Sequence, residues 1–251
     1  MRPFRLVVAV SAAALLGAGC GAETTSGNGV PAASSPAPSP TPSSNGVATL
    51  EPTEILSKSK AALKKVQSLR VKGGGKSEGA AFQLDMRYGN GGKAIGTISN
   101  NGKTIELRRI GQLVYLKGDR DFWTSIGGPS AANLFVGKYL KAPVSDKRVV
   151  DLASFTDKSR FVDQLLDPSG SKITKGGKKT IRGVQAVELL DKSADGGSLY
   201  IATTGQPYPL QLVPSSSGGD SGRLDFLDFG KSVTVPTPPA DQTVDVTKLG
   251  N

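Results

Sequence analysis

The chain contains one cysteine, Cys20, and no histidine in its 251 residues. A domain built from the residues after Cys20 therefore has no disulfide to stabilise it. The same composition excludes zinc sites made from cysteine and histidine, and it excludes catalytic triads that use either side chain. The fold must be held together by its hydrophobic core alone.

Cys20 closes a segment with the pattern of an export signal. Residues 1–5 carry two arginines, and residues 6–18 are apolar apart from Ser11 and Gly17. This run suits a signal peptide and is too short to span a bilayer. The Gly-Ala-Gly-Cys sequence ending at Cys20 resembles the bacterial lipobox, in which the signal is cut before the cysteine and the thiol receives a diacylglycerol. That motif usually has a larger aliphatic residue where Gly17 stands. We expect a signal peptide at residues 1–19 and a lipid anchor at Cys20, with an ordinary secretory signal as the alternative.

Residues 21–50 have the composition of a tether. Five prolines alternate with Ser, Thr, Ala and Gly, and Glu23 is the only charged residue. Such a segment buries too little apolar area to offset its ordering entropy. We therefore expect residues 20–50 to be a lipidated, disordered tether and residues 51–251 to be the folded domain. A chain that begins near Thr49 is then expected to keep its stability.

The charge of the chain points toward a membrane. Removing the signal takes away Arg2 and Arg5 and lowers the formal charge from +10 to +8. A basic exported protein is attracted to anionic surfaces such as its own membrane, although the charge can also serve solubility alone. We expect no nucleic-acid partner, because the protein would lie outside the cytoplasm.

The folded domain opens with an amphipathic helix. Pro52 and Thr53 suit a helix start, and apolar residues recur at helical spacing from Ile55 to Leu69. Alternating strands follow at residues 82–88, 93–99, 104–109 and 112–117. Their short connections, such as Asn100-Asn101-Gly102, favour an antiparallel meander.

The second half repeats this order of helices and then strands. Helices are expected at residues 122–136, interrupted at Gly127-Gly128-Pro129, and at residues 151–166, with an extended segment at 139–144 between them. Further strands are predicted at residues 172–174, 179–190, 199–203, 210–213 and 224–229. The economical fold is α+β: one curved antiparallel sheet, a half-barrel, with helices packed on its concave face.

The catalytic motifs are incomplete. Three Gly-Lys-Ser/Thr triplets, at residues 75–77, 102–104 and 230–232, lack the upstream glycine of a phosphate-binding loop. Ser57-x-x-Lys60 lacks the partner motifs of penicillin-binding proteins. Carboxylate pairs such as Asp119 and Asp121 occur in many acidic turns. We expect a protein that is not an enzyme and that holds no cofactor and no metal.

Several diffuse patterns resemble the actinobacterial lipoprotein family that includes LppX and LprG. They are the helix running from Ile55 into Arg70-Val71-Lys72, then Asp85-Met86-Arg87-Tyr88, Gly96-Thr97-Ile98, Val114-Tyr115-Leu116-Lys117, Phe122-Trp123, Gly137-Lys138-Tyr139-Leu140 and the late pair Tyr200-Ile201 and Gly205–Leu210. Members of that family often have a tryptophan where this chain has Tyr139. The resemblance implies a half-barrel like that of LolA and LolB, with an apolar cavity for acyl chains.

The resemblance also implies a function. A member of this family would bind lipids or lipoglycans in its cavity and carry them across the cell envelope, anchored through Cys20 on the outer face of the cytoplasmic membrane; we expect a monomer. A bulky residue at Gly96, which shares strand parity with Ile98, would then block lipid while sparing the fold. The cavity candidates are Phe82, Leu84, Met86, Tyr88, Ile98, Leu107 and Tyr115 on the strands and Trp123, Phe135 and Phe161 on the helices.

The sequence leaves two alternatives open. The same ten side chains would also suit a solid core, in which no cavity forms. The domain would then be a tethered interaction or sensing module with a closed core rather than a lipid carrier. A connected apolar void in the structure favours the carrier, whereas dense packing favours the module.

Overall fold

A computed structural model describes residues 43–248, apart from residues 78, 169–171, 194–195 and 216–220. These residues belong to one compact unit. The expected signal peptide, the expected anchor Cys20 and most of the expected tether lie outside the described residues.

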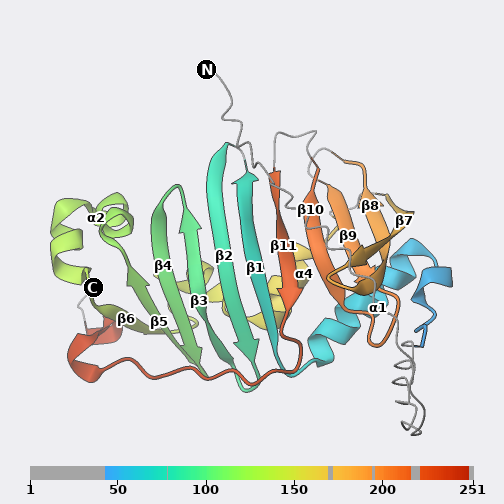
Figure 1. The fold of residues 1–251 in the computed structure, drawn as a ribbon. Coiled ribbons are helices and arrows are strands. Elements are labelled where there is room, and N and C mark those ends of the chain that lie inside the picture. The colour runs from blue at the N-terminus through green and yellow to red at the C-terminus, as the bar shows by residue number, and fades with distance from the viewer. Residues whose placement is uncertain (1–42, 78, 169–171, 194–195, 216–220, 249–251) are drawn as a thin grey trace, which may run out of the picture. The chain divides into compact units, whose positions relative to one another are not determined.

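The unit is built on an open, curved sheet of 12 strands (Figure 1). Its spatial order is β12-β6-β5-β4-β3-β2-β1-β11-β10-β9-β8-β7, and only the β12–β6 pair is parallel. The α+β fold with one curved, mostly antiparallel sheet is therefore confirmed. The strands are β1 (Leu69–Ser77), β2 (Ala80–Gly89), β3 (Lys93–Asn100), β4 (Lys103–Ile110), β5 (Leu113–Gly118), β6 (Tyr139–Pro143), β7 (Ile173–Ile181), β8 (Val184–Asp191), β9 (Gly197–Ala202), β10 (Pro209–Pro214), β11 (Ser221–Leu227) and β12 (Thr243–Asp245).

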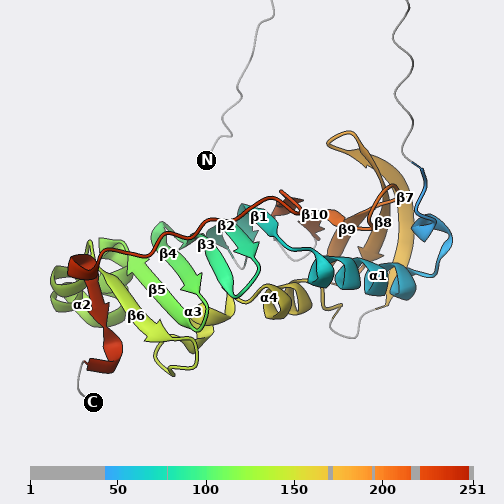
Figure 2. The ribbon, with the colours of Figure 1, turned by 90° about the horizontal axis from the view of Figure 1, so that it is seen from below.

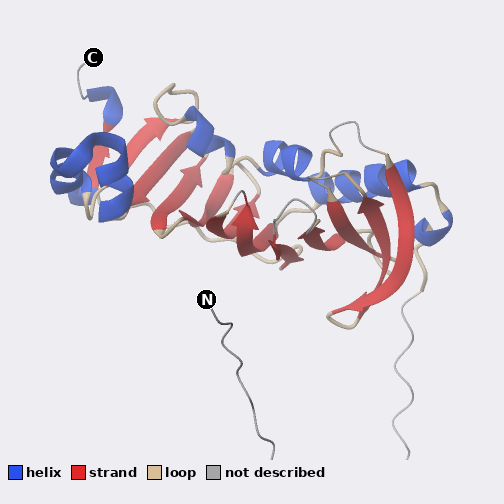
Figure 3. Ribbon diagram, turned by 90° about the horizontal axis from the view of Figure 1, so that it is seen from above, coloured by secondary structure: helices blue, strands red, loops and turns tan. Residues whose placement is uncertain are grey.

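The helices lie along one face of the sheet, here called the helix-covered face (Figures 2 and 3). Helix α1 begins with Pro52 at its first position and carries Glu54 in its first turn and Lys64 and Lys65 in its last, as the helix dipole favours. Helix α2 packs near β4 and β5 and bends at Gly127 and Gly128, as the sequence predicts. The helices are α1 (Pro52–Lys65), α2 (Arg120–Phe135), α3 (Val150–Ser154) and α4 (Lys158–Leu165), with short 3-10 turns η1 (Val47–Thr49), η3 (Ala240–Gln242) and η4 (Val246–Lys248).

Strand alternation divides the sheet into an apolar and a charged face. Leu84, Met86 and Tyr88 of β2 point toward the helices and are buried in the main core. Their neighbour Asp85 points to the outer face, where it accepts two hydrogen bonds from Arg70 at 2.7 and 2.5 Å. The alternation therefore supplies the core that a chain without disulfides needs.

Several boundaries differ from the sequence expectations. The first helix ends at Lys65, and Leu69 starts β1, a strand that the pattern does not predict because Gly73, Gly74 and Gly75 have low strand propensity. The expected helix at 151–166 is two helices, because the Asp157 side chain caps a new start at Lys158 by accepting a hydrogen bond from the Arg160 N–H. The expected strand at 179–190 is the β7–β8 hairpin.

The C-terminal segment also has more structure than its polar composition indicates. It runs past the ends of strands β1 to β5 and reaches the β6 side of the sheet (Figure 2). There β12 pairs with β6, and Val246 is buried in a small second core with Val114, Ala142, Val149 and Ala153. Arg108 fixes the middle of the segment by donating to the Pro236 carbonyl at 2.9 Å.

Ordered structure begins earlier than the expected domain start at Glu51. The Asn45 side chain donates to the carbonyls of Ala202 and Gly205 at 3.0 and 3.1 Å. Val47 is only 2% exposed and belongs to the main core. The boundary at residue 51 is therefore too late, because a valine in a polar segment gives no periodic signal of burial.

Candidate functional site

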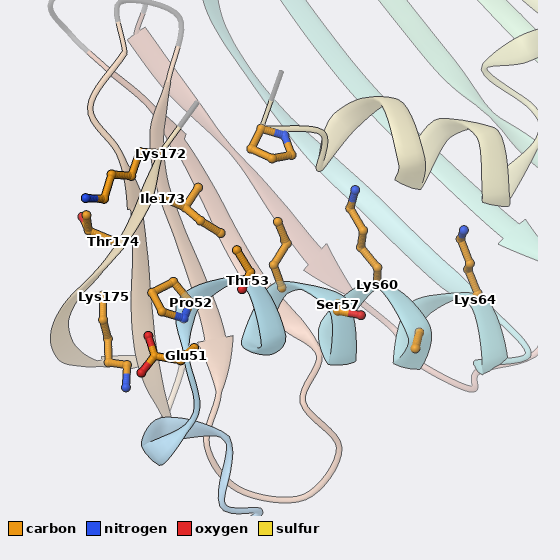
Figure 4. A pocket seen from close by; sticks show the side chains of 13 residues that line it. Glu51, Pro52, Thr53, Ser57, Lys60, Lys64, Lys172, Ile173, Thr174 and Lys175 are labelled. Carbon is orange, nitrogen blue, oxygen red and sulfur yellow. The ribbon is translucent and has the colours of Figure 1, made fainter. Parts of the chain in front are cut away.

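A groove of about 1090 Å³ lies between α1 and the start of β7 (Figure 4). The chain from Glu51 to Lys64 forms one wall and Lys172–Lys175 forms another, with Pro168 beyond the end of α4 closing the side. The groove follows directly from the fold, because α1 crosses the sheet beside its edge strand β7.

One flank of α1 lines this groove. Thr53, Ser57, Lys60 and Lys64 line it, at a spacing that places them in one row along a helix. Lys60 and Lys64 extend side by side from α1 toward α4 (Figure 4). The sequence places the lysines of this helix mostly off its apolar stripe, but it does not separate the groove-lining pair from the others.

An apolar hollow of about 380 Å³ adjoins the groove. Leu56, Pro168 and Ile173 line both spaces, so the hollow lies directly beside the groove, near the end of α4. The walls of the hollow are mainly aliphatic and come from α4 and from strands β8, β9 and β10: Leu165, Leu166, Leu189, Leu199 and Leu212. Asp167 and Asp191 also line it, and both have interaction partners.

Polar contacts hold α4 beside α1. The Lys158 ammonium donates to the Val66 carbonyl and, at 3.3 Å, to the Lys64 carbonyl at the end of α1. Burial lowers the pKa of Lys158, since removal from water disfavours its charged form. Lys64 and Asp163 add an ion pair at 2.8 Å between the two helices. These contacts hold α4 beside the C-terminal end of α1.

The predicted cavity residues lie elsewhere on the sheet. Nine of them, all except Tyr115, pack in or against the main core on the helix-covered face. Tyr115 pairs with Arg108 of β4 and shares its outer face, because alternation places Leu116 on the other side. Neither the groove nor the hollow is lined by any of these ten residues.

Gly96 is unsuited to the bulky substitution that the sequence suggests. A Cβ atom there would lie 2.1 Å from the Asp85 carbonyl oxygen and 2.7 Å from Met86 Cα on the neighbouring strand. A side chain at this position would therefore push β2 and β3 apart, whether or not a cavity lies nearby. The expectation that a large residue at Gly96 spares the fold is wrong.

Aromatic packing fills the core beneath α3 and α4. Tyr88 stacks on Phe161 with ring centroids 5.5 Å apart, and its hydroxyl donates to the Phe155 carbonyl at 2.9 Å. Burial raises the pKa of the Tyr88 phenol well above its ordinary value. Trp123 packs on Phe135 at 5.2 Å, and its indole N–H meets no acceptor among the described residues.

The structure also places the Ser-x-x-Lys motif. Ser57 and Lys60 both line the groove, and Figure 4 shows the Lys60 ammonium directed away from the Ser57 hydroxyl. Within the described ranges, no group of three or more acidic, cysteine or histidine side chains is placed to hold a metal ion. None of the described helices is long and apolar enough to cross a membrane.

Comparison with known proteins shows the fold. No protein-family model and no curated protein matches the chain. The structure is similar to the crystal structure of LprF from Mycobacterium bovis, with a TM-score of 0.50 and 18% identity over 74% of this chain and 96% of that one. It is also similar to the lipoprotein LppX from Mycobacterium tuberculosis, with a TM-score of 0.48 and 17% identity over 73% of this chain and 99% of that one. The resemblance expected from the sequence is confirmed at the level of the fold.

Proposed function

We propose that this protein is a lipid carrier that binds acyl chains in the hollow beneath α4 and exchanges them through the α1–β7 groove. The observation that carries this proposal is the adjacency of the two spaces, whose linings share Leu56 and Ile173. An acyl chain needs an apolar space that opens to the surface, and binding needs no catalytic group. The proposed ligands are lipids or lipoglycans of the cell envelope.

Burial alone supplies the affinity in this proposal. Each CH₂ group removed from water contributes about 0.8 kcal/mol. The hollow has a volume of about 380 Å³, within the range of roughly 300–1,000 Å³ typical of small-molecule sites. The hollow therefore suits part of an acyl chain, and the remainder of the lipid would occupy the groove.

Anchoring through Cys20 completes the proposed cycle. A diacylated cysteine would hold the monomer at the outer face of the cytoplasmic membrane, where it could take up a lipid and deliver it to the outer envelope. Cys20→Ser is expected to move the protein from the membrane fraction to the soluble fraction. Wild-type levels of membrane association in this variant would contradict the anchor assignment.

Blocking the passage between groove and hollow tests the carrier function. Ile173 is half-buried at the margin of the main core and lines both spaces, so a tryptophan there should extend into the space where they meet. We expect this variant to lose uptake of a pyrene-labelled phospholipid while keeping its melting temperature. Lys178→Trp, at an exposed position of the same strand outside the groove, is the matched control and should load normally.

A specific observation supports the interaction module as the second candidate. Ile126 and Leu134 on α2 are 68% and 55% exposed. A protein partner would cover apolar side chains of this kind. The uptake experiment separates the two functions. Ile173→Trp with unchanged uptake, or a wild-type protein that takes up no lipid, would contradict the carrier and leave the module.

A further inference from the structure

The groove carries an excess of positive charge. Four lysines line it, Lys60, Lys64, Lys172 and Lys175, against the single carboxylate of Glu51. Lys175 donates to the Ala48 carbonyl at 3.1 Å and Lys64 pairs with Asp163. Lys60 forms no ion pair or hydrogen bond with another described residue, so its charge is free to bind a ligand.

Lys60 and Lys64 are placed to act together. They lie one turn apart on the same flank of α1, and their side chains run parallel toward α4 (Figure 4). The Lys64–Asp163 pair joins side chains that are 44% and 49% exposed. Such exposed pairs contribute little to stability, so an incoming anion can replace Asp163 at small cost.

The charged pair lies on the helix that also borders the hollow. Leu56, which lines both spaces, precedes Lys60 by one helical turn on the same side of α1. An acyl chain that passes over Leu56 into the hollow therefore leaves the polar end of its lipid beside Lys60 and Lys64. The two carboxylates of the hollow, Asp167 and Asp191, are already engaged in other interactions.

From this arrangement we infer that the groove selects lipids whose head group carries a phosphate or carboxylate close to the acyl chains. The inference rests on the proposed function and adds the class of ligand to it. Lys60 and Lys64 bind the anionic group, and the leucines of the hollow bind an acyl chain. A lipid with a zwitterionic head group of the same chain length gains less, because its cationic end is repelled by the same lysines.

The test compares two pyrene-labelled lipids with identical acyl chains, phosphatidylglycerol and phosphatidylcholine. The mature chain with Cys20→Ser, which removes the expected anchor, is incubated with vesicles of each lipid and recovered free of them. The protein with both lysines intact should take up more phosphatidylglycerol than phosphatidylcholine. Lys60→Gln with Lys64→Gln should lower uptake of phosphatidylglycerol by about fivefold for each lysine and leave phosphatidylcholine uptake unchanged.

A matched variant controls for general attraction to anionic vesicles. Lys58→Gln with Lys65→Gln removes the same charge from the same helix at exposed positions outside the groove, and it should keep the preference. Equal uptake of the two lipids, or an equal loss in both double variants, would overturn the inference and leave the carrier function standing. Excess glycerol phosphate should weaken the preference for phosphatidylglycerol, because a free anion of the same chemistry competes for the two lysines. Failure to take up either lipid would overturn the proposed function itself.

Discussion

The apolar face of the sheet is packed differently in its two halves. The half from β1 to β5 is here called the filled half, and the half from β8 to β10 is called the open half. Under β1 to β5, aromatic and aliphatic side chains pack against α2, α3 and α4, and Tyr88 and Met86 are fully buried. Under β8 to β10, leucines of the same face border the hollow. Leu84 and Leu199 illustrate the contrast, since each is 7% exposed but, of the two, Leu199 lines the hollow. Burial alone therefore does not distinguish a core residue from a binding residue.

The largest expected effect tests this contrast directly. Leu84→Ala should lower the free energy of unfolding by about 3–5 kcal/mol, because it creates a new cavity in a filled region. Leu199→Ala should cost about 2–3 kcal/mol, because part of its surroundings is already empty. Chemical denaturation of the two variants measures the difference. Equal costs, or a larger cost at Leu199, would break the comparison.

The next effect concerns backbone packing in the filled half. Gly96→Ala should cost about 1–3 kcal/mol, since its Cβ would contact the Asp85 carbonyl and force β2 and β3 apart. Thermal denaturation measures the loss. Gly177→Ala on β7 is the control, because its Cβ would meet no atom within 4 Å. A Gly96→Ala protein as stable as the control would contradict this prediction, because β2 and β3 would then accommodate the Cβ atom without a loss of stability.

A smaller loss of stability is expected at Val47, where the end of the expected tether packs against the folded unit. Val47→Ala should lower stability by about 2 kcal/mol through lost burial, and the melting temperature should fall by roughly 4–8 °C in a domain of this size. A chain that begins at Glu51 should lose at least as much relative to one that begins at Ser43, since it also lacks the Asn45 hydrogen bonds. An unchanged melting temperature would restore residue 51 as the domain boundary.

The smallest effect lies on the outer face of the filled half. Hydrogen bonds from Arg70 hold the pKa of Asp85 below its ordinary value of 3.8. A carboxyl group with a lower pKa in the folded state stabilises the protein above its unfolded pKa, and this contribution is lost as the pH falls through the folded value. Asp85→Asn should cost about 1 kcal/mol at pH 7 and weaken the loss of stability below pH 4. Chemical denaturation of the wild type and the variant at pH 7 and at pH 3 measures the difference.

Local patterns in the sequence predict most of the elements of this fold. The alternation from Phe82 to Tyr88 predicts β2 and its buried face, and Asn100-Asn101-Gly102 predicts the β3–β4 turn, where Asn101 and Gly102 have positive φ angles. These features depend on the period of side chains and on turn chemistry, which a chain carries within a few residues. The same reasoning fails at β1, where pairing with β2 and β11 overrides the weak propensity of three glycines.

The position of the candidate site was decided by the tertiary structure alone. The sequence identifies apolar faces, and for this chain it determined the absence of disulfides, the antiparallel sheet and the amphipathic helix α1. It does not determine which part of the apolar face is densely packed. That depends on how closely α1 and α4 approach β8, β9 and β10, strands that lie more than a hundred residues after α1 in the chain. Lys58 and Lys60 are both lysines on α1, and the sequence does not distinguish their roles. Only the docking of α1 beside β7 places Lys60 in the groove and leaves Lys58 outside it.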